Sequence, residues 1–102
     1  MQNNNIATKS QNKVLFDLGQ TVMTIGAKEE LAKSNLSPLE FLARHQSGDW
    51  GIIGKEDAKE NDFSVKNDFR IFSAYKTSQD VKIWVITEAD RSSTTILLPD
   101  EY

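Results

Sequence analysis

The chain has 102 residues, a length that fits one domain with a modest core. Its net charge of −3 weighs against a broad phosphate-binding surface, which needs clustered Lys and Arg. The absence of Cys excludes a disulfide framework and a Cys-based zinc site, and a single His excludes a site built from several His. We therefore expect no metal and no cofactor.

The sequence shows no segment for membrane insertion or export. No apolar run approaches the roughly 18–20 residues of a membrane helix, and no apolar signal core follows the first residues. We expect a soluble, cytoplasmic protein without membrane contact. Residues 1–13 are polar and rich in Asn and Gln, which predicts a flexible tail. Residues 14–102 are expected to form a single domain.

The first half of this domain predicts a short strand and a short helix. The strand is expected over residues 20–24, with Gly19 as a bend before it. Gly26 is then expected to open a helix over residues 27–34. Acidic side chains in its first turn suit the positive end of the helix dipole.

The strongest local signal predicts a helix over residues 38–46. Ser37 is its expected N-cap, Pro38 occupies the first helical position, and Glu40 completes a capping box. Gly48 stands where a left-handed residue ends a helix. The expected apolar stripe of this helix consists of Leu39, Leu42 and Ala43, with Phe41 on its flank.

The second half predicts one charged helix and three strands. The helix is expected over residues 56–68, and strands over 70–76, 81–87 and 93–98. Short loops between the strands predict an antiparallel meander. The chain is therefore expected to be an α+β domain whose helices pack on one face of a four-stranded sheet. An edge strand of such a sheet could support a homodimer.

The strand over residues 81–87 has two different faces. Val81, Ile83 and Val85 point one way and are expected to meet the helices. Trp84 lies on the other face, between Lys82 and Ile86, which is typical of a face half open to water. Trp84 is thus a candidate binding residue, although the N-terminal segment could equally cover it.

The turn after this strand is a second candidate site. Arg91 could bind a phosphate or a carboxylate through both guanidinium nitrogens, and hydroxyl side chains follow it in the sequence. Asp90, Arg91 and Ser92 are therefore candidate binding residues. The structural alternative is that Asp90 and Ser92 hold the turn itself, while Arg91 pairs with a neighbouring carboxylate.

His45 and Trp50 form a third candidate. His45 lies near a helix C-terminus and could be a general acid or base, since His titrates near neutral pH. It could also be packed in the core, holding the turn at Gly48. Trp50 could be a stacking platform or a core residue. Together with Arg91 and Thr95 (or Ser93), His45 is a candidate catalytic residue.

A set of motifs along the chain carries a resemblance to a known family. They are Gly19-Gln20, Ser37-Pro38-Leu39-Glu40-Phe41-Leu42-Ala43-Arg44-His45, Ser47-Gly48-Asp49-Trp50-Gly51, Ser73-Ala74-Tyr75, Trp84 to Ser92, Thr94-Thr95 and Leu98 to Tyr102. With these motifs the chain from residue 18 to the C-terminus, about four-fifths of its length, resembles a family of small proteins of bacterial plasmids and integrative elements, usually described as plasmid-related. The resemblance implies a mobile-element setting and supplies no catalytic residue.

Two functions follow as hypotheses. The first is a non-enzymatic protein-interaction module of a mobile element, favoured by the acidic balance and by the face around Trp84. The alternative is a small ribonuclease of barnase- or RelE-like architecture, an analogy at the level of fold alone. It requires His45 and Arg91 to flank one phosphate. A nucleic-acid partner is disfavoured by the acidic pI of about 5.1.

Overall fold

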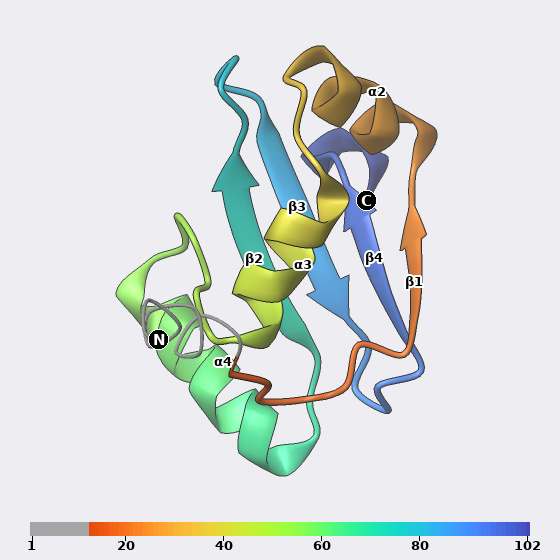
Figure 1. Ribbon diagram of the computed structural model, residues 1–102. Coiled ribbons are helices and arrows are strands. Elements are labelled where there is room, and N and C mark those ends of the chain that lie inside the picture. The colour runs from red at the N-terminus through yellow and green to blue at the C-terminus, as the bar shows by residue number, and fades with distance from the viewer. Residues whose placement is uncertain (1–12) are drawn as a thin grey trace, which may run out of the picture.

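The computed structural model describes residues 13–102, so almost all of the predicted tail lies outside the described residues. The described part is an α+β domain, as predicted (Figure 1). Its elements in chain order are β1 (Gln20–Met23), α2 (Ile25–Lys33), α3 (Pro38–Gln46), α4 (Lys55–Asn67), β2 (Ile71–Lys76), β3 (Lys82–Thr87), β4 (Ser93–Leu97) and the short 3-10 helix η1 (Pro99–Glu101).

The four strands form one sheet in the order β1-β4-β3-β2. The three later strands make the predicted antiparallel meander. The sheet is nevertheless mixed rather than purely antiparallel, because β1 pairs parallel with β4, from Gln20 opposite Ser93 to Met23 opposite Ile96. A parallel pair requires a long crossover connection. The three helices and two further strands between β1 and β4 supply it.

The helices cover one face of the sheet (Figure 1). The larger core cluster lies between that face and helices α2 and α3, and a smaller cluster lies beneath α4. In α3 the buried side chains are Phe41, Leu42 and His45, whereas Leu39 is 71% exposed. The predicted stripe was therefore wrong at Leu39 and at Ala43, which are both exposed, because the helix turns its Phe41 side to the sheet.

The helix starts differ in detail from those predicted. Ser37 caps α3, but its hydroxyl accepts from the amide of Leu39 rather than from that of Glu40. Helix α2 begins at Ile25, before Gly26, because Thr24 is its N-cap and accepts from the Ala27 amide. An additional carboxylate from the distant C-terminal segment, Glu101, accepts from the Thr24 hydroxyl and from the Gly26 amide. It ties η1 to the start of α2.

The outer edge of β2 is covered by other parts of the chain. Residues 50–52 run parallel to it: the Ile52 amide donates to Ala74 at 2.7 Å, and the Ala74 amide donates to Trp50 at 3.2 Å. Further along, the Asn61 side chain bonds both backbone groups of Phe72. No helix of the described residues is long and apolar enough to cross a membrane.

Candidate functional site

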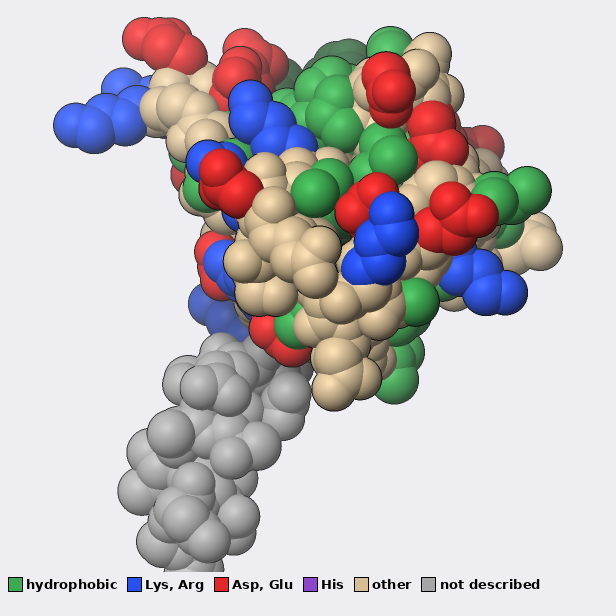
Figure 2. Space-filling model, turned by 90° about the horizontal axis from the view of Figure 1, so that it is seen from above, with side chains coloured by type: hydrophobic (Ala, Val, Ile, Leu, Met, Phe, Trp, Pro, Cys, Tyr) green, Lys and Arg blue, Asp and Glu red, His purple; other side chains and the backbone are tan. Residues whose placement is uncertain are grey.

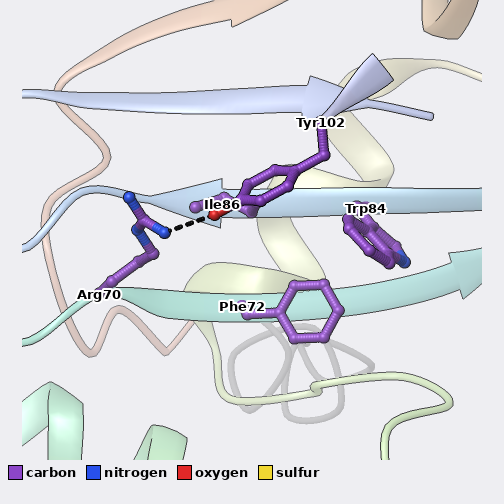
Figure 3. Close-up of a pocket in the computed structure, with 5 residues that line it drawn as sticks. All are labelled: Arg70, Phe72, Trp84, Ile86 and Tyr102. Atoms are coloured by element: carbon purple, nitrogen blue, oxygen red, sulfur yellow. Dashed lines mark hydrogen bonds between the residues drawn. The ribbon is translucent and has the colours of Figure 1, made fainter. Parts of the chain in front are cut away.

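The face of the sheet that carries no α-helix, called the helix-free face below, has a shallow hollow of about 230 Å³. Figure 3 shows its lining side chains, which come from β2, β3, the segment before β2 and the residue after η1. These residues are Arg70, Phe72, Trp84, Ile86 and Tyr102. Strand alternation explains why the side chains from β2 and β3 lie together, because Phe72 pairs with Ile86 and Ala74 pairs with Trp84 on this face of the sheet.

The aromatic rings of the hollow stand edge to face. The Phe72 and Trp84 centroids are 5.0 Å apart, and those of Trp84 and Tyr102 are 5.9 Å apart. Arg70 closes one end: its guanidinium donates to the Tyr102 hydroxyl at 2.8 Å and pairs with Glu88 at 3.4 Å. The hollow is thus lined mainly by aromatic and aliphatic side chains, with one guanidinium at its end.

The other end of this face carries two lysines. Lys76 and Lys82 are directly opposite each other across β2 and β3, and both are exposed. They lie two residues from Ala74 and Trp84, so they share the face of the hollow. Like charges directly opposite each other destabilise a sheet. Asp80 offsets this at Lys76 through an exposed ion pair of 3.2 Å.

The turn at Asp90, Arg91 and Ser92 is held by its own hydrogen bonds. Asp90 accepts from the Ser92 amide at 3.0 Å, and Arg91 has a positive φ of 60°. The Arg91 side chain is 13% exposed, and its guanidinium lies 5.7 Å from the centre of the Phe16 ring. The guanidinium donates to four backbone carbonyls, those of Ser64, Phe69, Glu88 and Ala89. Arg91 thus ties the end of α4 to this turn.

His45 belongs to a buried chain of hydrogen bonds. Thr94 donates to the Leu18 carbonyl at 2.7 Å, so its oxygen accepts from the Thr87 hydroxyl, also at 2.7 Å. Thr87 must then accept from His45 Nε2–H at 2.9 Å. His45 Nδ1 is left as the acceptor for the Ser73 hydroxyl at 2.6 Å. The Leu18 carbonyl therefore fixes the Nε2–H tautomer of His45, since a carbonyl can only accept.

This environment removes His45 from acid–base chemistry at neutral pH. The imidazole is fully buried between Phe16 and Trp50, and burial lowers its pKa from 6.5 to about 3. A general base must reach the proton that it removes. Both ring nitrogens are bonded internally, so His45 gives the ribonuclease hypothesis no exposed base.

Trp50 packs against His45, but neither it nor Thr95 completes a catalytic site there. Trp50 is buried, and its indole N–H donates to Asp62 at 3.3 Å, so it is a core residue. Thr95 follows Thr94 in β4 and therefore points to the helix-free face, opposite Ile86. His45 bonds Thr87 on the helix face. The sheet thus lies between His45 and Thr95.

The sequence analysis found Trp84 and the Ile86 beside it but missed Phe72 and Tyr102. Phe72 could have been placed beside Trp84 by the alternation of β2 once its register with β3 was known, but residue spacing alone does not give that register. No pattern in the sequence placed Tyr102 near Trp84. Tyr102 lies over β3 because the chain folds back at η1 (Figure 3). Among the described residues, no group of three or more His, Cys, Asp or Glu side chains could hold a metal ion.

Comparisons of the chain with protein-family models, with curated proteins and with solved structures find no match. The plasmid-related resemblance stays a prediction from the motifs quoted above.

Proposed function

We propose that this chain is a non-enzymatic protein-interaction module of a bacterial mobile element. The mobile-element setting rests on the sequence resemblance. The interaction role rests on one observation: the aromatic hollow at Phe72, Trp84 and Tyr102 lies on the sheet face that carries no helix. Aromatic residues and Arg are the side chains most enriched at the energetic centres of protein interfaces.

The charges around the hollow indicate which chemistry the partner surface needs. Arg70 lies at one end of the face, where it pairs with Glu88, and the Lys76–Lys82 pair lies at the other, where Asp80 pairs with Lys76. Three cationic side chains against two carboxylates leave the face slightly basic in a chain of net charge −3. An acidic partner would relieve the repulsion between the two lysines. We infer that the partner is a protein surface or segment that places an apolar side chain in the hollow and carboxylates beside the lysines.

The distribution of charge favours a protein partner over nucleic acid. Figure 2 shows Lys and Arg side chains interspersed with Asp and Glu at the end of the molecule seen there, rather than gathered in one basic area. Nucleic-acid surfaces need such an area to neutralise several phosphates. The face of the hollow is likewise mixed in charge, since Glu88 pairs with Arg70 and Asp80 pairs with Lys76.

The test is photo-crosslinking in bacteria that carry an element encoding this chain. A photo-reactive p-benzoylphenylalanine replaces Lys82 on the helix-free face or, as a matched control, the exposed Glu40 on α3. The proposal expects position 82 to crosslink to a partner protein that position 40 does not capture. That partner, once purified, should bind the wild-type chain. The same adduct from both positions, or binding of RNA or DNA oligonucleotides instead of a protein, would overturn it.

A further inference from the structure

The free edge of the sheet is β1. Residues 50–52 and Asn61 cover the outer edge of β2, but no other segment of residues 13–102 pairs with the outer edge of β1. The Gln20 amide donates to the carbonyl of Ser92, just before β4, and the Thr24 amide donates to the carbonyl of Ile96 in β4. By strand alternation, the backbone groups of Thr21 and Met23 point outward and are ready to pair with another strand.

This edge is short, at four residues, but it lacks the side-chain features that usually prevent pairing. Exposed edge strands are normally blunted by charged side chains, by Pro or by a bulge. β1 has the sequence Gln20-Thr21-Val22-Met23, which contains neither charge nor Pro. Val22 is 43% exposed on the helix-free side. On the helix side, a groove of about 170 Å³ runs between β1 and α3, where Leu39 is 71% exposed.

We propose that the occupant of this edge is a second copy of the chain, whose β1 pairs antiparallel with the first across a two-fold axis at Val22. In that register Thr21 of each copy is opposite Met23 of the other, so the outward backbone groups of both strands are satisfied. The strand is uncharged, so no like charges meet at the axis. The Met23 side chain of each copy, on the helix side, lies beside the groove and Leu39 of the other.

The closed edge of β2 makes this association self-limiting. A sheet with two open edges can add copies without end, whereas one open edge gives an isologous dimer. The two helix-free faces then lie on the same side of one continuous sheet. The dimer does not depend on the partner proposed above, because β1 and the hollow around Trp84 are separate surfaces.

The test uses the absence of Cys in the chain. In the proposed register Val22 faces its own copy in a non-hydrogen-bonded pair, with Cα atoms about 4.5 Å apart, which is within the range of a disulfide. Under mild oxidation V22C is expected to form a covalent dimer of twice 11.5 kDa. Q20C lies on the same face of the same strand, but about 14 Å from its own copy in this register.

Q20C therefore controls for register, and S78C, in the exposed loop between β2 and β3, controls for random collision. Light scattering of the wild-type chain should give a dimer mass, and V22K, which places two positive charges at the axis, should give a monomer mass. L39K provides a second variant at the groove, with the same expectation. A monomeric wild-type chain, or V22C crosslinking no faster than Q20C or S78C, would overturn the proposal.

Discussion

Lowering the pH from 7 to 5 should destabilise this protein through His45. The imidazole is fully buried, and burial lowers its pKa to about 3, against 6.5 for an exposed His. Between these two values the unfolded chain binds a proton that the folded chain does not. Stability from this group is therefore complete above the unfolded pKa of 6.5 and is lost as the pH falls toward 3. At pH 5 the loss is about 2 kcal/mol, from 1.36 kcal/mol per pH unit.

The assay is urea unfolding followed by tryptophan fluorescence, since Trp50 lies 5.9 Å from the His45 ring and reports on this part of the core. A loss of about 2 kcal/mol corresponds to a midpoint lower by roughly 1–2 M urea. His45→Gln removes the titrating group and should flatten the dependence between pH 7 and 5, whatever its own stability. An unchanged wild-type midpoint, or an equal slope in the variant, would refute the buried neutral imidazole.

Three further predictions concern the scaffold, each measured as a urea midpoint at pH 7. Arg91→Lys should cost about 2 kcal/mol, because one ammonium cannot reach four carbonyls; a neutral result would mean that these bonds contribute little. Thr94→Val should cost about 1–3 kcal/mol by leaving the Leu18 carbonyl unpaired, and a stabilised variant would contradict the chain of hydrogen bonds. Gly19→Ala should destabilise strongly, since its φ is +67° and a Cβ would lie 2.4 Å from the Arg91 carbonyl oxygen; Gly54→Ala, with open space around it, is the tolerated control.

Local patterns in the sequence were enough to locate the secondary structure. Helix α3 was predicted with its observed bounds because Ser37 and Pro38 mark its start and Gly48 follows its end. The meander strands were found from their alternation and short loops. The direction of β1 was not predictable in this way. Four residues do not encode which strand they pair with, and a parallel partner some seventy residues away is chosen by the packing of the helices between them.

Among the candidate site residues, too, local patterns were enough for some and not for others. Trp84 was placed on the helix-free face from strand alternation, and the structure puts it in the hollow. His45, Trp50 and Arg91 were also candidate site residues in the sequence, each with a structural alternative. They are structural because of distant partners: Thr87 and Ser73 for His45, and backbone carbonyls for Arg91. Those contacts depend on strand register, which residue types and local spacing do not determine.

The most direct test of the interaction role is the affinity of the purified chain for the protein that crosslinks at position 82. Calorimetry should compare the wild-type chain with Trp84→Ala and, as a control on the helix side, Glu40→Ala. Centres of protein interfaces lose 2 kcal/mol or more on truncation, so Trp84→Ala should weaken binding about 30-fold or more, with Glu40→Ala unchanged. Equal affinities for all three chains would contradict an interface centred on the hollow.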